Sequence, residues 1–179
     1  MRQPLHLHPG STCGAVAGIE AEALRCGPAG LRLHYVVTGA IGELLIPPPA
    51  APRRQDGLWQ HSCFEAFVRS GPEEAYFELN FAPSGEWAAY RFDDYRAGMA
   101  DADLPPPRIT TRADAARFEL EAEIALPPFL ADASWQLGLS AVIEERSGRK
   151  SYWALRHPPG KADFHHPESF ALQLDPVRP

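Results

Sequence analysis

Alternating apolar and polar positions dominate the middle of the chain. In residues 74–81, Ala75, Phe77, Leu79 and Phe81 alternate with Glu74, Tyr76, Glu78 and Asn80. Side chains two apart share one face of a strand, so one face is apolar and the other carries carboxylate, phenol and amide groups. Similar alternation recurs in residues 62–69 and 86–92, and the connecting Ser70-Gly71-Pro72 and Pro83-Ser84-Gly85 suit turns. Residues 58–99 are therefore predicted to form a three-stranded antiparallel meander.

The rest of the chain shows the same strand pattern. Further strands are predicted over residues 16–26, 31–38, 117–124, 135–144, 151–155 and 168–174, with prolines clustered between them. No segment sustains a helical period of 3.6 residues. We predict an all-β fold: an antiparallel β-sandwich of jelly-roll type with about ten strands, formed by residues 1–179 as a single domain. We expect His6 and His8 to lie in a mobile N-terminal segment.

Composition limits the partners of the protein. The net charge is −6 with no basic run, which disfavours nucleic acid and anionic membranes. No stretch approaches the roughly 20 apolar residues of a membrane helix, and the N-terminal MRQPLHLHPGS lacks the apolar core of a signal peptide. The three cysteines show no metal-ligand spacing and suit free thiols in a reducing compartment. We therefore expect a cytoplasmic protein with neither nucleic acid nor membrane as a partner.

The polar face of the meander is the first candidate site. The alternation places Glu65, Asn80 and Arg91 on the face away from the core. Glu65 and Arg91 on neighbouring strands could form a charge-assisted pair that bonds ligand hydroxyls, or a plain salt bridge. Trp59 follows an Asp-Gly turn and precedes Glu65 by six residues. Its indole could lie flat over the apolar face of a sugar, or could cap the core of the sandwich.

A second dense patch lies between Tyr152 and His166. It contains Trp153, His157, Lys161 and Asp163 in and before a proline-stiffened loop. Loops on a rigid sheet often carry binding groups, so this loop is a candidate for the ligand site, and an ordinary surface loop is the alternative.

Enzyme signatures are not found in the sequence. It contains no G-x-S-x-G elbow, no P-loop and no G-x-G-x-x-G motif. Glu65 and Glu78 could face each other on neighbouring strands, and paired carboxylates suit glycoside hydrolysis. Strand neighbours in a sandwich more often bind or face solvent, so we expect a protein that is not an enzyme.

Three segments of the chain resemble a known family. DGLWQHSCFEAFV, YFELNFAPSGEWAAYRFDDYRAGM and SYWALRHPPGKADFHHPESF resemble bacterial DOMON-like proteins, which are similar to type 9 carbohydrate-binding modules. The resemblance covers the chain from about Pro47 to Phe170. It implies a jelly-roll β-sandwich that binds a ligand without turning it over, and the wider superfamily recognises sugars or haem.

The resemblance also implies roles for individual residues. In the sugar-binding modules two tryptophans sandwich the terminal sugar, while glutamate, arginine and amide groups bond its hydroxyls. Trp59 and Trp153 match the two walls, Glu65 and Arg91 the polar floor, and Asn80 the amide. His157, Lys161 and Asp163 join this candidate site only because their loop follows Trp153.

Two cofactors are alternatives under the same resemblance. The haem branch uses a methionine and a histidine as axial ligands, which Met99 with His61 or His157 could supply. The sugar-binding modules often hold calcium, for which Asp93, Asp94, Asp101 and Asp103 are the acidic candidates. We expect no cofactor. The predicted function is noncatalytic binding of a small saccharide or related polyol, and the alternatives are a haem-binding redox module and a protein-interaction domain.

Overall fold

Strands make up most of the structure. The computed structural model describes residues 1–71 and 73–177, so Pro72 of a predicted turn and the last two residues of the predicted domain lie outside the described residues. The strands are β1 Gln3–Leu7, β2 Val16–Cys26, β3 Gly30–Gly39, β4 Cys63–Ser70, β5 Tyr76–Phe81, β6 Trp87–Phe92, β7 Ala100–Asp101, β8 Arg108–Ala113, β9 Arg117–Ala125, β10 Trp135–Glu144, β11 Lys150–Ala154 and β12 Leu172–Leu174. Four short 3-10 turns accompany them: η1 Ile41–Glu43, η2 Leu58–Gln60, η3 Pro128–Leu130 and η4 Pro167–Ser169.

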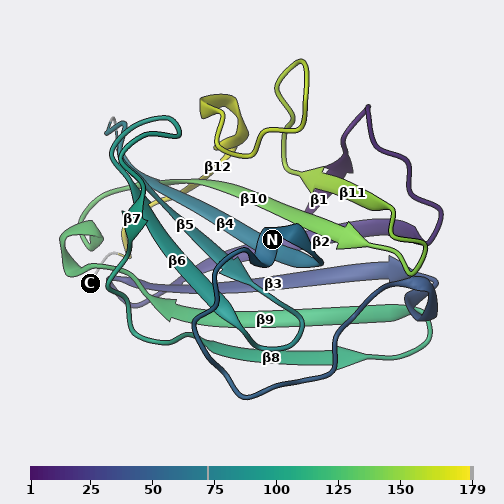
Figure 1. Ribbon diagram of the computed structural model, residues 1–179. Coiled ribbons are helices and arrows are strands. Elements are labelled where there is room, and N and C mark those ends of the chain that lie inside the picture. The colour runs from purple at the N-terminus through teal and green to yellow at the C-terminus, as the bar shows by residue number, and fades with distance from the viewer. Residues whose placement is uncertain (72, 178–179) are drawn as a thin grey trace.

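The strands pair into one continuous antiparallel sheet. Their order is β7-β6-β5-β4-β10-β11-β1-β2-β3-β9-β8, and β12 pairs with β10 beside this path (Figure 1). The prediction of an all-β antiparallel fold is confirmed. The described part of the chain forms a twelve-stranded sheet instead of about ten, because β1, β7 and β8 were not expected. The pairing does not establish a jelly-roll topology, which stays a prediction.

β1 corrects the expectation of a mobile N-terminus. Gln3–Leu5 pair with β2, whereas His6 and Leu7 pair with Ala154 and Trp153 of β11. Both edges of this short strand are therefore used, and it joins the two halves of the sheet. Its weak alternation gave no signal, since pairing partners distant in the sequence determine its structure.

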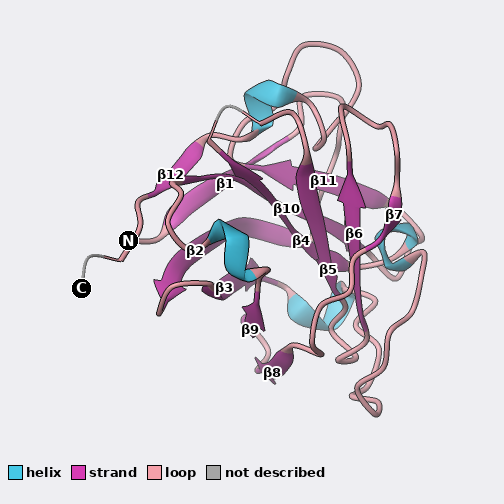
Figure 2. Ribbon diagram, turned by 90° about the vertical axis from the view of Figure 1, so that its left-hand side faces the viewer, coloured by secondary structure: helices cyan, strands magenta, loops and turns pink. Residues whose placement is uncertain are grey.

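The sheet curls so that its two halves face each other across one apolar core. Figure 2 shows β3, β9 and β8 lying below β10, β4 and β5, in the shape of a half-barrel. Across this core the rings of Phe64 and Phe118 stack with centroids 5.7 Å apart. The Tyr35 hydroxyl donates a hydrogen bond to the Glu65 carbonyl at 2.7 Å, which satisfies a buried polar group.

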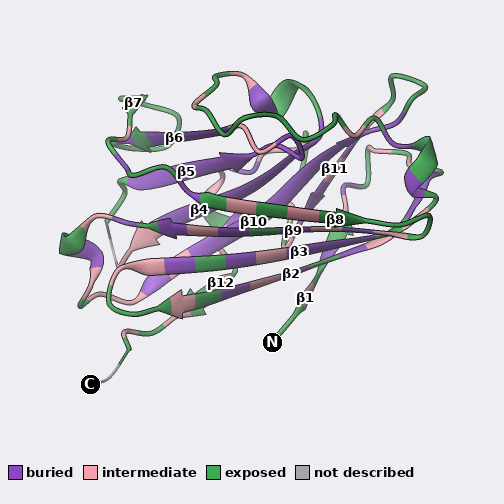
Figure 3. Ribbon diagram, turned by 90° about the horizontal axis from the view of Figure 1, so that it is seen from below, coloured by how far each residue is buried: buried purple, intermediate pink, exposed green. Residues whose placement is uncertain are grey.

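The other face of β4, β5 and β6 carries a second apolar cluster. Phe67, Tyr76, Tyr90 and Phe92 belong to it, and Leu58 and Phe164 from loops pack over them. Every side chain of β5 is consequently buried. Figure 3 shows that β4, β5 and β10 are mostly buried, whereas the residues of β8 are exposed or only partly buried. Glu65, Glu78 and Asn80 are therefore shielded from bulk water rather than exposed. No helix among the described residues is long and apolar enough to span a membrane.

Candidate functional site

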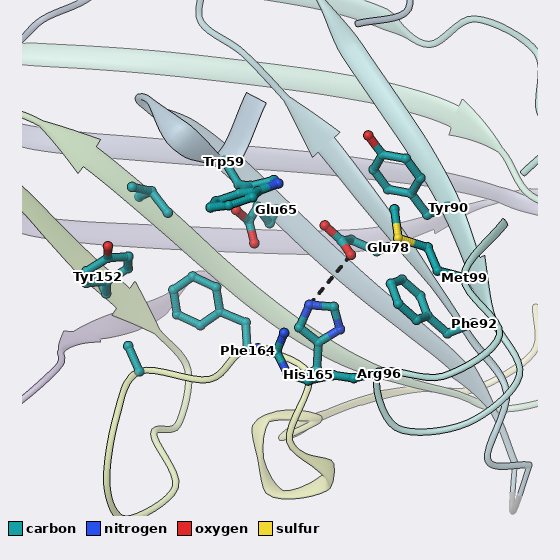
Figure 4. A pocket seen from close by; sticks show the side chains of 12 residues that line it. Trp59, Glu65, Glu78, Tyr90, Phe92, Arg96, Met99, Tyr152, Phe164 and His165 are labelled. Carbon is teal, nitrogen blue, oxygen red and sulfur yellow. Dashed lines mark ion pairs between the residues drawn. The ribbon is translucent and has the colours of Figure 1, made fainter. Parts of the chain in front are cut away.

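A pocket of about 440 Å³ opens on this second face of the sheet. Its floor is formed by strand residues: Glu65 from β4, Glu78 from β5, Tyr90 and Phe92 from β6, Val142 from β10 and Tyr152 from β11. Its walls come from three loops, with Trp59 on η2, Arg96 and Met99 before β7, and Ala162, Phe164 and His165 after β11 (Figure 4). A rigid floor and loop-borne walls are a common arrangement for a ligand site.

Trp59 is presented to the pocket by the turn before it. Gly57 has φ +76°, a left-handed conformation that glycine adopts without steric cost, and it turns the chain into η2. Leu58 is buried beneath this 3-10 turn, whereas the Trp59 side chain is 55% exposed. Figure 4 shows the indole above the Glu65 carboxyl, with its ring edge toward Glu78. The predicted indole wall therefore lies over a predicted polar group.

Two carboxyl groups lie side by side on the floor of the pocket. Glu78 Oε1 accepts a hydrogen bond from Asn80 Nδ2 at 2.7 Å, so Asn80 orients a floor residue without lining the pocket itself. Glu65 is 3% exposed, and its Oε1 has no hydrogen-bond partner among the described residues. Burial, followed by the charge of Glu78, raises the pKa of Glu65 well above its ordinary value of 4.5. Burial also raises the pKa of Glu78.

Arg96 supplies the cation of the pocket wall. Its Nη2 donates to Asp163 Oδ1 at 2.8 Å, and its backbone N–H donates to the Tyr76 hydroxyl at 3.2 Å. Tyr95 also hydrogen-bonds Asp163. Arg96 has φ +53°, a strained conformation for a side chain with a Cβ, and such strain persists where surrounding contacts fix it. Asp163 thus holds a wall residue in place and does not itself line the pocket.

His165 closes the pocket beside Glu78. Its Nδ1 hydrogen-bonds the Tyr76 hydroxyl at 2.7 Å, and its Nε2 lies 3.7 Å from Glu78 Oε2. Burial, and then the nearby Arg96 charge, lowers the pKa of His165 to about 4. The imidazole is therefore neutral at pH 7 and does not neutralise the floor carboxyls.

Arg91 does not lie where the alternation placed it. It faces the same side of the sheet as Phe77, opposite to Glu65, and is exposed in an ion pair with Asp93. In β6 it is Trp87 and Ala89 that enter the main core, whereas Tyr90 and Phe92 face the pocket. Because both faces of β6 are apolar, the alternation could not show which face was which.

Trp153 lies on the core face of β11, opposite to the face that was predicted for it. Its indole is 6% exposed in the main core, where Nε1 donates to Ser151 Oγ at 2.9 Å. The expectation that Trp153 forms a wall of the pocket is therefore corrected. The neighbouring Tyr152 points to the pocket instead.

The remaining predicted residues lie beside the pocket. His157 is half-buried, bonds the His6 carbonyl through Nε2 at 2.8 Å and packs against the His8 ring. Lys161 is exposed on the loop next to Ala162 and does not line the pocket. Of the predicted set, the structure brings Trp59 and Glu65 together, with Asn80 and Asp163 supporting other pocket residues. Three pocket residues were not predicted from the sequence as members of the candidate site: Arg96, Phe164 and His165.

The arrangement of the side chains gives little support to the haem and calcium alternatives. In the described parts of the chain, no three histidine, cysteine, aspartate or glutamate side chains gather as a metal site would require. Asp101 pairs with Arg54 at 2.6 Å, and Asp93 with Arg91. His61 pairs with Glu144 at 2.7 Å outside the pocket, so it does not face Met99 within it.

The raised pKa of Glu65 predicts a pH-dependent stability. A carboxyl with a raised folded-state pKa contributes stability below its unfolded value, near 4.5, and loses that contribution as pH rises through the folded value. Glu65→Gln removes this titration, so the melting temperature of this variant relative to that of the wild type should rise as the pH increases above about 4.5. A difference of ~1 kcal/mol corresponds to roughly 2–4 °C in a domain of this size.

Thermal melts between about pH 5 and about pH 8 check the prediction. Glu121→Gln is the matched control, because Glu121 is exposed on β9 away from the pocket. The melting temperature of this variant should differ little from that of the wild type, because Glu121 does not contact the pocket. A difference in melting temperature between Glu65→Gln and the wild type that stays the same at every pH would contradict the conclusion that the pKa of Glu65 is raised.

Comparisons with known proteins concern the fold. No family model matches the sequence, and no curated protein matches it. The structure is similar to that of a "putative carbohydrate-binding protein" from Bacteroides uniformis ATCC 8492, with a TM-score of 0.62 over 94% of this chain and 83% of that chain, at 13% identity. It is also similar to a family 9 carbohydrate-binding module from Caldicellulosiruptor kristjanssonii in complex with cellotriose, with a TM-score of 0.50 over 89% of this chain and 74% of that chain, at 13% identity. These similarities show the fold, and the DOMON-like assignment stays a prediction.

Proposed function

We propose that this protein binds a small saccharide in the pocket beneath Trp59 and does not turn it over. The observation that carries the proposal is an exposed indole lying over buried carboxyls in a pocket of about 440 Å³. Small-ligand pockets have volumes of ~300–1,000 Å³, with apolar walls and a few placed polar groups. The neighbours described as carbohydrate-binding support the proposal through their similar fold.

The pocket matches the two chemical surfaces of a sugar. A pyranose has an apolar face of C–H groups, which can stack on the Trp59 indole, and a rim of hydroxyl groups. The hydroxyls would meet Glu65 and Glu78 on the floor. A protonated carboxyl both donates and accepts hydrogen bonds, so the raised pKa of Glu65 suits a hydroxyl partner. The unpartnered Glu65 Oε1 would then be satisfied by the ligand.

Binding is favoured over hydrolysis by the placement of the carboxyls. Glycosidases place two carboxyls on either side of the scissile bond. Glu65 and Glu78 instead lie together on the floor, on neighbouring strands of one sheet face (Figure 4). A sugar stacked on Trp59 would meet both from the same side, which suits recognition.

The residues of the pocket do not fit haem as well as they fit a polyol. Met99 and His165 do line the same pocket. However, Nδ1 of His165 is bonded to Tyr76 and its Nε2 faces the buried Glu78. Two buried carboxyls would also lie against the apolar face of a porphyrin, which is unfavourable.

A thermal-shift screen tests the proposed function. Purified protein is heated with monosaccharides, disaccharides and sugar acids, and a saccharide at about 100 times its Kd should add ~2.7 kcal/mol of stability, which raises Tm by several degrees. A Soret band after haem addition, or a stable protein complex with no response to sugars, would contradict the proposal. The cytoplasmic location, the single domain over residues 1–179, and the absence of nucleic acid and membrane partners stay predictions.

A further inference from the structure

The pocket contains two buried carboxyls and no free cation to balance them among the described residues that line it. Arg96 is already paired with Asp163 at 2.8 Å, so its charge offsets the burial of Glu78 only in part, and His165 is neutral at pH 7. Glu78 is bonded by the amide of Asn80. Glu65 Oε1 has no hydrogen-bond partner among the described residues, although the nearby Ser140 hydroxyl acts to lower the pKa of this carboxyl. A buried acceptor without a partner costs free energy, so a donor from the ligand is the natural complement.

Aromatic and sulfur-containing side chains surround the same two carboxyls. Trp59, Tyr90, Phe92 and Phe164 line the pocket, and Met99 lines it as well (Figure 4). Aromatic ring faces attract cations through their quadrupole, and the attraction strengthens where water is excluded. An aromatic enclosure above acidic groups is the arrangement expected for an organic ammonium ion.

We propose that the saccharide bound here carries a protonated amine, which lies between the Glu65 and Glu78 carboxyls and the surrounding rings. The inference rests on the proposed function and names the ligand class more closely. A neutral sugar could bond one protonated carboxyl through its hydroxyls. The ammonium of an amino sugar could in addition balance one negative charge on the carboxyl pair, which a hydroxyl cannot do.

Proton release follows from this arrangement. Before binding, burial raises the pKa of both carboxyls and favours the form in which Glu65 and Glu78 are both protonated. When the ammonium enters, one of the two carboxyls ionises and its proton passes to solvent, so one carboxylate balances one ammonium while the amine keeps its own proton. The groups packed around the pair do not supply this proton. Arg96 and Asp163 form an ion pair, His165 is already neutral, and burial raises the pKa values of Cys63, Tyr35, Tyr76 and Tyr90.

Isothermal titration with matched sugar pairs tests the inference. The probes are glucose with glucosamine and galactose with galactosamine, which within each pair differ by one amine in place of one hydroxyl. Near pH 6 the primary amine is protonated. The amino sugar of at least one pair should bind about tenfold more tightly than its neutral partner. Its binding enthalpy should also depend on the ionisation enthalpy of the buffer, with about one proton released.

Isosteric variants of Glu65 and Glu78 test whether the preference for the amine arises from these two carboxyls. Glu65→Gln and Glu78→Gln should each remove most of the preference for the amine and of the proton release, so that the two sugars of each pair bind with nearly equal affinity to the variant. Glu121→Gln, exposed on β9, should keep both and is the matched control. Thermal melts of each variant establish that it is folded, and the use of two independent floor variants keeps the test valid if one fails to fold.

The possible outcomes separate this inference from the proposed function. Equal affinity within both sugar pairs would overturn the amine inference and leave saccharide binding in place. Binding of cyclohexylamine as tight as that of the amino sugars would support the ammonium site and contradict recognition of the sugar. Failure of the four sugars and of cyclohexylamine to bind would overturn the amine inference, whereas the proposed function is overturned only if the disaccharides and sugar acids of the thermal-shift screen also fail to bind.

Discussion

Replacing Trp153 with alanine should lower the free energy of unfolding by about 3–5 kcal/mol. The indole is almost fully buried between the two halves of the sheet, and it pairs in register with Leu7 of β1 and Ala141 of β10. Truncation would leave a large cavity and would remove the donor that bonds Ser151 Oγ. Urea denaturation followed by circular dichroism measures the loss.

A second variant keeps the Trp153 test interpretable. Protein stabilities are ~5–15 kcal/mol, so Trp153→Ala could abolish folding altogether. Trp153→Phe retains an aromatic ring and should lose markedly less stability. A loss below about 1 kcal/mol for Trp153→Ala would show that the indole does not support the core.

Replacing Trp59 with alanine should have the opposite profile. The side chain is 55% exposed, so the free energy of unfolding should change by no more than about 0.5 kcal/mol. Loss of the stacking surface should weaken saccharide binding by about 2 kcal/mol, or roughly thirtyfold in Kd. Calorimetric titration of the ligand found in the screen, on the wild type and the variant, measures this change.

Trp59→Phe distinguishes stacking from other causes. It keeps an aromatic face in the same place and should retain most of the affinity that Trp59→Ala loses. Unchanged affinity in Trp59→Ala would place the ligand elsewhere on the molecule. A large loss of stability in that variant would instead make the indole a structural cap.

The strands of the meander could be predicted from the sequence because their alternation is local. Glu65 was predicted from side-chain parity within its own strand. Trp59 was predicted from the turn before it and from the family resemblance, because it lies on a 3-10 turn where strand parity does not apply. The parity of β6 and β11 was not readable. Trp87, Tyr90 and Phe92 are all apolar and buried, so either face of β6 could have been the core. If the two faces of a strand are assigned the wrong way round, every residue moves to the opposite face. For this reason Tyr152 lines the pocket in place of Trp153, and Arg91 lies outside it.

Other parts of the site depend on contacts that no local pattern reports. Arg96 and Asp163 meet across 67 positions of the chain, and Phe164 reaches the pocket from a loop after the last long strand. The pairing of β1 with both β2 and β11 is likewise set by partners distant in the sequence. Such contacts join residues that are distant in the sequence, so local sequence patterns could not predict them.

The division between a strand-built floor and loop-built walls determines which positions can change during evolution. β4, β5 and β6 carry the floor on one face and the main core on the other, so a shift in their register would disturb both together. Trp59, Met99 and Phe164 project from loops whose backbones take no part in the sheet. Substitutions and short insertions there could retune the size and shape of the accepted ligand while the scaffold keeps its stability. Related chains with this scaffold are therefore expected to diversify at the walls and to preserve the floor, and a library for altered specificity is best confined to those three loops.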